Sequence, residues 1–194
     1  MVPKGSTIDF DPWLSELPEI LLAYDISRVR LFMASCCERQ QANYTAFSTE
    51  VNWGDSIVLR EAGDTLWRLA ETPSTPYLNA IIRQLQKVTP DTEDFSSDLT
   101  SAALDAAVSM QEAMEYLIDS DTAHCVTICS MVRDTIRMYL EQESFLSISE
   151  LEIRELSKQQ ADLRTLAELP EFTPSVVDLF RRCSIPNGKS NLDR

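Results

Sequence analysis

The sequence predicts an all-α protein, organised as a single multihelical, bundle-like domain of about seven or eight helices. Two observations predict this class. Only four glycines occur in 194 residues, and the apolar residues recur at spacings of three and four, which places them on one face of a helix. At this length the chain fits one domain, 1–194, which buries about 70% of its unfolded surface.

The N-terminal third contains three predicted helical segments. The first carries an apolar set of its own: Trp13, Leu14, Leu17, Ile20, Leu21 and Leu22. The second has the clearest stripe, at positions i, i+3, i+4, i+7 and i+8: Val29, Phe32, Met33, Cys36 and Cys37. The third is predicted to begin near Asp55, after Gly54, and to end at Pro73. Its expected inner face is Val58, Ala62, Thr65, Leu66 and Leu69, with Trp67 on the flank.

Two further helices are predicted in the middle of the chain. One begins with Thr75 as N-cap and Pro76 at the first helical position, where no N–H donor is needed. The segment 89–97 contains Pro90 and closely spaced acids, so it is predicted to be a loop. The second helix carries a stripe of small residues from Leu99 to Leu117, which neighbouring helices can approach closely. We therefore expect this helix to lie centrally.

The C-terminal third contains three predicted helices and a tail. The first carries a stripe from Cys125 to Leu140, opened by Ser120 or Asp121. The second has two alternative capping boxes: Ser149 with Glu152, or Ser147 with Glu150. Because it turns polar at 158–160, it is expected on the outside of the bundle or along one narrow seam; Pro170 ends it. Thr173 and Pro174 start a short last helix with Val176, Val177, Phe180 and Cys183 on its inner face. Residues 1–8 and 185–194 are predicted to be loose termini.

Composition argues against several classes of partner. Thirty-one acidic residues against 17 Lys and Arg give a net charge of −14, which repels nucleic acid and anionic membranes. No segment has the apolar length of a membrane span or of a signal peptide. Five cysteines, an odd number, give no disulfide framework. We therefore expect a cytoplasmic protein with reduced thiols, no nucleic-acid partner and no membrane partner.

The residues that usually carry catalysis or bind metals are sparse. His124 is the only histidine, so one chain cannot supply the two Glu-x-x-His motifs of a di-iron bundle, and we expect it to be neutral and structural in the first turn of a helix. The adjacent pair Cys36 and Cys37, with Cys125 and Cys129, falls on apolar stripes, which favours core packing over a four-thiolate metal site. No glycine-rich phosphate loop occurs. No metal or cofactor is predicted.

A long acidic stretch lies between Lys87 and Arg133. These 45 residues contain no Lys or Arg and hold nine acids: Asp91, Glu93, Asp94, Asp98, Asp105, Glu112, Glu115, Asp119 and Asp121. Such a run is most often a solvated face. It would also suit a basic partner or a divalent cation, although the spacing of a calcium loop is absent.

Several short motifs resemble a known family. They are Cys37-Glu38-Arg39, Asn43-Tyr44, Gly54-Asp55 and Trp67, with weaker similarity around Asp105 and at Gly188, Ser190 and Asn191. In order and spacing they resemble the YjaG-like bacterial family, known as domain of unknown function 416. The resemblance implies a small multihelical protein in the cytoplasm. It implies no reaction.

These motifs allow two interpretations. In the structural one, Glu38 and Arg39 end the apolar stripe of the second helix, and Arg39 pairs with a carboxylate to hold the following turn at Asn43 and Tyr44. In the functional one, six polar side chains converge on a cleft between helices and bind a small ligand or a metal: Glu38, Arg39, Asn43, Tyr44, Asp55 and Asp105.

Two functional hypotheses follow. The first is a non-enzymatic protein-interaction module that binds another protein and forms a homodimer through apolar helical surface, for which the segment from Trp13 to Leu22 is the candidate. The second is a carboxylate-based metal or small-molecule site in a helical cleft, which would allow an enzymatic role, centred on Glu38 and Asp105. Because no catalytic constellation is present, the first hypothesis is preferred.

Overall fold

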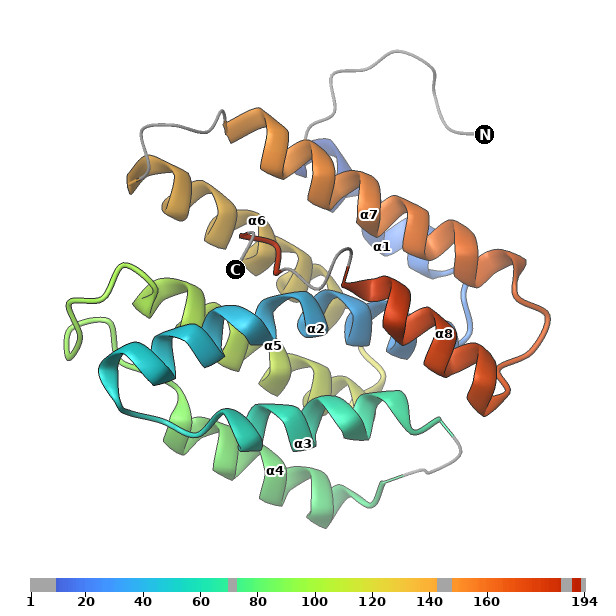
Figure 1. Ribbon diagram of the computed structural model, residues 1–194. Coiled ribbons are helices and arrows are strands. Elements are labelled where there is room, and N and C mark those ends of the chain that lie inside the picture. The colour runs from blue at the N-terminus through green and yellow to red at the C-terminus, as the bar shows by residue number, and fades with distance from the viewer. Residues whose placement is uncertain (1–9, 70–72, 143–147, 186–189, 193–194) are drawn as a thin grey trace.

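The fold is all-α, as predicted. The computed structural model describes residues 10–69, 73–142, 148–185 and 190–192, and within them it contains eight α-helices and no strand (Figure 1). The expected loose N-terminus, 1–8, lies outside these residues. The helices are α1 (Phe10–Leu21), α2 (Ile26–Val51), α3 (Ser56–Trp67), α4 (Thr75–Val88), α5 (Thr100–Asp119), α6 (Ala123–Gln142), α7 (Ile148–Glu168) and α8 (Pro174–Ser184).

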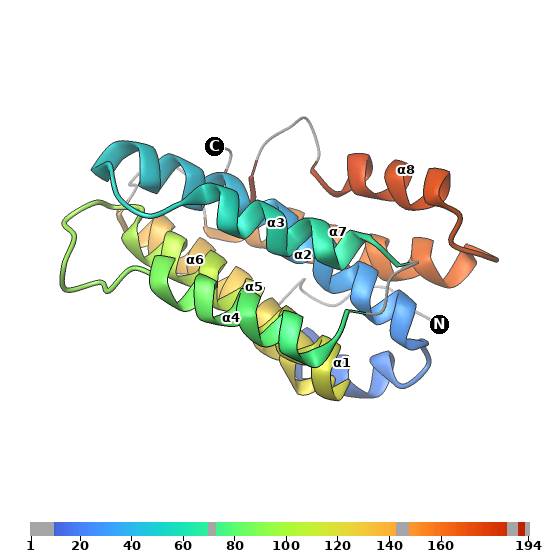
Figure 2. The ribbon, with the colours of Figure 1, turned by 90° about the horizontal axis from the view of Figure 1, so that it is seen from below.

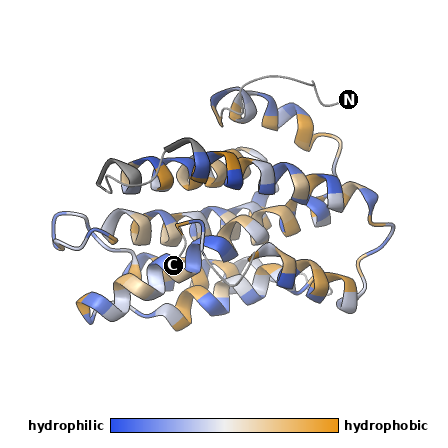
Figure 3. Cartoon of the chain, turned by 45° about the horizontal axis from the view of Figure 1, so that its top comes forward, coloured by the Kyte–Doolittle hydropathy of each residue, from blue (hydrophilic) through white to orange (hydrophobic). Residues whose placement is uncertain are grey.

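Helices α2 and α5 form the centre of the bundle. The α2 helix packs against α3, α5, α6, α7 and α8, and α5 packs against α2, α3, α4 and α6. As expected, the small residues of α5, such as Ala103, Ala106 and Ala107, are fully buried and allow this close approach. Figure 2 shows α8 on the opposite side of the bundle from α1, and Figure 3 shows apolar and polar residues alternating around the helices.

The α2 helix is longer than the sequence predicted. Glu38 and Arg39 do not end it: it continues to Val51 and stops at Asn52, which has a left-handed backbone with φ 51°. Asn43 and Tyr44 therefore lie inside a helix and not at a turn. The polar side chains that follow the apolar stripe are buried against other polar groups. Their polarity therefore does not mark the end of the helix.

Helix starts with local signals were predicted well. Asp55 caps α3 by accepting a hydrogen bond from the Ile57 backbone N–H at 2.9 Å, and Thr173 caps α8. The N-cap of α4 is Ser74, one residue before the predicted Thr75. At the start of α6, Asp121 accepts a hydrogen bond from the Ala123 backbone N–H. For α7, the capping box with Ser147 lies outside the described residues. The α3 helix ends at Trp67, before Pro73.

An aromatic cluster braces one end of the bundle. The Phe95 ring, from the loop between α4 and α5, lies 5.2 Å from the Phe47 ring and 5.0 Å from the Trp53 ring. Trp53 belongs to the turn between α2 and α3, so two loops that are distant in the sequence are held against each other. In the same turn Gly54 adopts φ +81°, and its missing side chain leaves room for the Tyr44 hydroxyl.

The C-terminal third differs most from the prediction. The α7 helix packs against α2 and α6, which agrees with the expected packing along one seam. The seam is polar, which was not expected: Glu155, Gln159 and Asp162 are at most 3% exposed. Residues 190–192 are also buried, where a loose tail was expected. The α8 helix forms as predicted with Val177 and Phe180 inside, but Cys183 is exposed and does not belong to its inner face.

The α1 helix docks on its own bundle. Its apolar residues Phe10, Trp13 and Leu17 are buried, and the helix packs against α6. The Trp13 indole N–H donates to Gln159 Oε1 on α7 at 2.9 Å. Of the surface that the sequence offered for self-association, only Leu22 remains largely exposed, at 80%.

We predict that Gly54→Ala destabilises the protein by roughly 1–3 kcal/mol. Alanine is strained at the positive φ of this position, and its Cβ would lie 2.4 Å from Tyr44 Oη. Chemical denaturation followed by circular dichroism measures the change. Gly63→Ala in α3 is the matched control. A Cβ at position 63 would most closely meet the movable end of the Gln41 side chain, and the backbone there does not have a positive φ. Equal stability losses in the two variants would contradict the prediction.

Candidate functional site

The guanidinium of Arg39 on α2 is a deeply buried charged group. It is 2% exposed and pairs with two carboxylates of α7. Nη2 lies 2.7 Å from Glu155 Oε1, and Nη1 lies 3.1 Å from Asp162 Oδ2. Burial by itself lowers the pKa of Arg39, but the two carboxylates outweigh it and raise the pKa above its usual value. Arg39 is therefore a permanent cation held in the core.

The Arg39 network is extended and balanced by neighbouring groups. Arg39 Nη1 also donates to the Ser35 hydroxyl at 2.7 Å, and Ser35 donates to Asp162 at 2.8 Å. Lys158 forms an ion pair with Asp162, so two cations face two carboxylates. Every charged group in the network has a partner, as buried charges require.

Glu38 belongs to a second cluster, on the α3 and α8 side of α2. Its Oε2 accepts a hydrogen bond from the Trp67 indole N–H at 2.9 Å, and its Oε1 lies 3.1 Å from Arg181 Nη2. Arg181 also pairs with Asp64 at 2.6 Å and lies over the Trp67 ring, 5.6 Å from its centroid. Glu38 thus joins three helices.

Asn43 binds the C-terminal segment. Its Nδ2 donates to Asn191 Oδ1 at 2.7 Å, and the Asn191 backbone N–H donates to the Arg39 carbonyl at 3.2 Å. Both asparagine side chains are almost fully buried. Among the residues that the structure describes, their other amide atoms, Asn43 Oδ1 and Asn191 Nδ2, have no hydrogen-bond partner, and neither has Gln41 Nε2.

The remaining three candidates lie elsewhere. The Tyr44 hydroxyl donates to the Val88 carbonyl at the end of α4, and Asp55 caps α3. Asp105, on α5, accepts a hydrogen bond from Thr135 on α6 at 2.5 Å. Burial raises the pKa of Asp105 to about 6, although the Thr135 hydroxyl opposes this. The six candidates therefore do not converge on one cleft. Arg39 and Asn43 both contact Asn191, and Tyr44 lies beside Asp55, but the contacts of Glu38 and Asp105 share no residue.

The histidine and the cysteines take structural places. His124 lies between Glu112, 2.7 Å from Nδ1, and Asp119, 3.1 Å from Nε2. Burial lowers its pKa, but these carboxylates outweigh burial and raise the pKa, which favours the protonated form relative to a free histidine. Cys36, Cys37, Cys125 and Cys129 are free and fully or almost fully buried, as core packing predicts, and burial raises the pKa of each thiol.

The described residues contain neither a cluster of metal-binding side chains nor a helix that could span a membrane. No three or more His, Cys, Asp or Glu side chains in this part of the chain are arranged to hold a metal ion. None of its helices combines the length and the apolar character needed to cross a membrane.

Comparison with known proteins identifies the family. Residues 3–193 match the sequence model described as "Protein of unknown function (DUF416)". The chain belongs to the DUF416 family. Two curated relatives, each called uncharacterized protein YjaG and found in Salmonella typhimurium strain LT2 and in Salmonella typhi, are 23% identical over 170 residues, which cover 83% of this chain and 87% of the relative.

A solved structure has the same fold. The crystal structure of a DUF416 family protein from Shewanella baltica OS155 matches with a TM-score of 0.79 at 23% sequence identity, over 91% of this chain and 96% of that chain. The resemblance found in the sequence motifs is thus confirmed.

The DUF416 motif residues contact one another across the fold. Glu38 bonds Trp67, Asn43 bonds Asn191, and the Tyr44 ring lies against Gly54. Each contact joins α2 to a different segment of the chain. The residues that carry the family resemblance therefore hold the bundle together, and most of them are already occupied by intramolecular partners.

We predict that Arg39→Met destabilises the protein by about 3–5 kcal/mol, because Glu155 and Asp162 lose their buried cation. Denaturant titration gives the free energy of unfolding. Arg133→Met is the control: Arg133 pairs with the largely exposed Asp11 and Asp134, and such pairs contribute about 0–1 kcal/mol. If Arg39→Met costs no more than Arg133→Met, the buried network is not a major stabilising element.

We predict that Asp105→Asn flattens the pH dependence of stability. The folded-state pKa of about 6 lies above the ordinary aspartate value of 3.8, so the folded state holds the proton more tightly and stability falls as pH rises from about 4 to about 6. The asparagine variant lacks this loss and should gain about 1–3 kcal/mol relative to the wild type above pH 6. Unfolding free energies across this range test the prediction, and parallel curves for the two proteins would contradict it.

Proposed function

We propose that this DUF416 chain is a cytoplasmic, non-enzymatic protein-interaction module that binds a basic segment of another protein at one end of its bundle. This acidic end consists of five exposed carboxylates in the turn between α2 and α3 and in the loop between α4 and α5. They are Asp55, Asp91, Glu93, Asp94 and Asp98.

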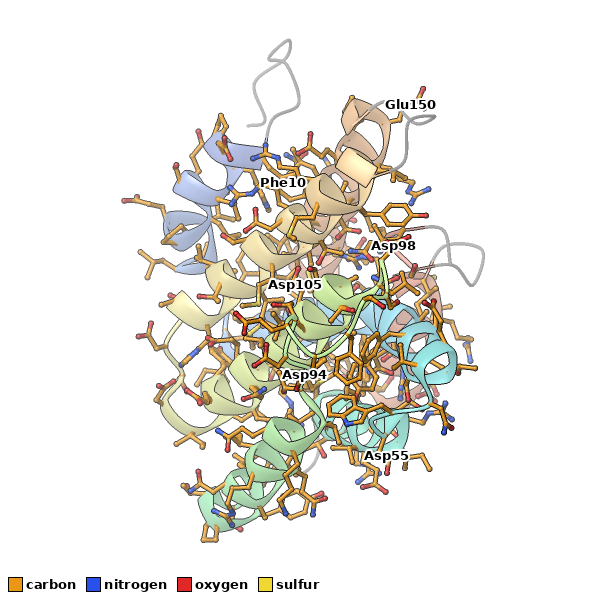
Figure 4. The ribbon with its side chains drawn as sticks, turned by 90° about the vertical axis from the view of Figure 1, so that its left-hand side faces the viewer. Phe10, Asp55, Asp94, Asp98, Asp105 and Glu150 are labelled. Carbon is orange, nitrogen blue, oxygen red and sulfur yellow. The ribbon has the colours of Figure 1, made fainter. Side chains whose placement is uncertain are left out.

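The observation that carries the proposal is that one of these acids, Asp91, lines a hollow beside a braced surface. The hollow has a volume of about 440 Å³ and lies beside the loop, with Pro90, Asp91, Leu104 and Val108 among its lining residues. The contacts of Phe95 with Trp53 and Phe47 hold the two acidic loops together. Figure 4 shows Asp55, Asp94 and Asp98 on the same side of the molecule.

The charges at the acidic end are available to a partner. No ion pair within the described residues involves any of the five carboxylates. By contrast, Glu38 and Arg39 are neutralised inside the protein. A basic segment with an apolar side chain would pair with the loop carboxylates and place that side chain in the hollow.

Self-association remains a separate proposal. The apolar face of α1 is buried within the chain, so a homodimer would have to use another surface. A net charge of −14 on each copy disfavours contacts between two acidic ends.

We predict that a partner is lost when four loop acids are neutralised together, as Asp91→Asn, Glu93→Gln, Asp94→Asn and Asp98→Asn. Each exposed ion pair contributes about 0.2–1 kcal/mol, so losing four weakens binding by roughly tenfold or more. Affinity capture with quantitative mass spectrometry compares the variant with the wild type at low and high salt.

The control neutralises four acids elsewhere: Glu16, Glu19, Glu168 and Glu171, each to Gln. All four are exposed, so the net charge changes equally. The proposal requires a partner that the wild type and the control retain, that the loop variant loses, and that salt releases. If both variants retain the same partners, the acidic end is not the binding surface.

A further inference from the structure

A second hollow lies along α2, on another side of the helix from the Arg39 network. It has a volume of about 590 Å³, and its lining comes from α2, from α3 and from residues 185 and 190. The lining that matters here is an apolar floor, Ala42, Ala46 and Ile185, and three polar groups, Gln41, Glu50 and Arg60. We call this hollow the α2 groove.

The α2 groove holds one free charge of each sign. Glu50 and Arg60 are both exposed, and neither forms an ion pair within the described residues, with each other or with any other group. The other carboxylate of the groove, Glu38, is already paired with Arg181. The charges left to a ligand are therefore one anion and one cation.

One amide group of the groove is already enclosed by the protein. Gln41 Nε2 is buried and has no hydrogen-bond partner within the described residues, and it lies against Gly63 on α3, 2.4 Å from where a Cβ of that residue would stand. The polar groups that the groove offers to a ligand are therefore the exposed side chains of Glu50 and Arg60.

We propose that the α2 groove binds a small zwitterion with an apolar body, of the size and chemistry of a dipeptide. Its carboxylate would pair with Arg60 and its ammonium group with Glu50, which leaves no net charge unpaired. Its apolar side chains would cover Ala42, Ala46 and Ile185. Since Glu50 and Arg60 form no direct ion pair, a molecule with two separated charges suits them better than a single ion. This site is independent of the acidic end, and neither proposal rests on the other.

The test uses L-leucyl-L-leucine as the probe, with isothermal titration calorimetry on the whole protein. Two analogues each lack one charge: N-acetyl-leucyl-leucine has no ammonium group, and leucyl-leucinamide has no carboxylate. Each should bind roughly tenfold more weakly than the dipeptide, the loss expected for one charge-assisted contact. If the dipeptide does not bind, or if either analogue binds equally well, the proposal is wrong.

Variants assign the contacts to residues. Arg60→Gln should weaken binding of the dipeptide roughly tenfold and leave binding of leucyl-leucinamide unchanged, because that analogue has no carboxylate to lose. Glu50→Gln should show the reverse pattern, with N-acetyl-leucyl-leucine unaffected. Arg83→Gln, an exposed arginine on α4, is the control and should change nothing. Equal losses for Arg60→Gln and Arg83→Gln would overturn the assignment.

Discussion

The buried cation of Arg39 is the constraint on which the C-terminal half of this fold depends. Removing a guanidinium and two carboxylates from water is unfavourable unless their geometry is good and every donor and acceptor is satisfied. Here Glu155 and Asp162 lie about two turns apart on one face of α7, and both meet Arg39 on α2. A shift of α7 by one turn would leave at least one carboxylate unpaired in the core. The network thus fixes the register of α7 on α2, a specificity that apolar contacts alone would not impose.

The rest of the architecture follows from the two sides of α2. The apolar side, with Phe32, Met33 and Phe47, packs into the core that α3, α5 and α6 share. The polar side bonds the C-terminal elements: Arg39 holds α7, Glu38 holds α8 through Arg181, and Asn43 holds Asn191. One long helix therefore joins an apolar bundle to a polar outer layer. This explains why the motifs of the family resemblance cluster on α2 and on the residues that it contacts.

Local signals made the fold class and most helix starts predictable, whereas long-range pairing was not. Asp55 and Thr173 mark the starts of their helices, because the side chain of a cap bonds a backbone N–H two or three residues later. Arg39 and Glu155 are 116 residues apart, so the sequence indicated a carboxylate partner for Arg39 but could not identify it. For that reason the sequence left two placements of α7 open, on the outside of the bundle or along one narrow seam. Glu155, Gln159 and Asp162, which recur at helical spacing, form a buried polar seam. The sequence did not indicate Glu50 and Arg60 as binding residues, because they line one groove only in the folded chain.

The acidic surface is connected to the way the interior uses its arginines. Arg28 donates to the carbonyls of Leu166 and Leu169 at the end of α7, at 2.9 and 2.7 Å, and Arg30 donates to the Leu66 carbonyl at the end of α3 at 2.7 Å. Such contacts satisfy the unpaired carbonyls and the negative end of the helix dipole. Together with Arg39 and Arg181, they commit four of the 17 basic residues to internal bonds in a chain that already has 31 acids. The loop between α4 and α5 has four acids and no basic residue of its own, so a partner that binds there has to supply the positive charge.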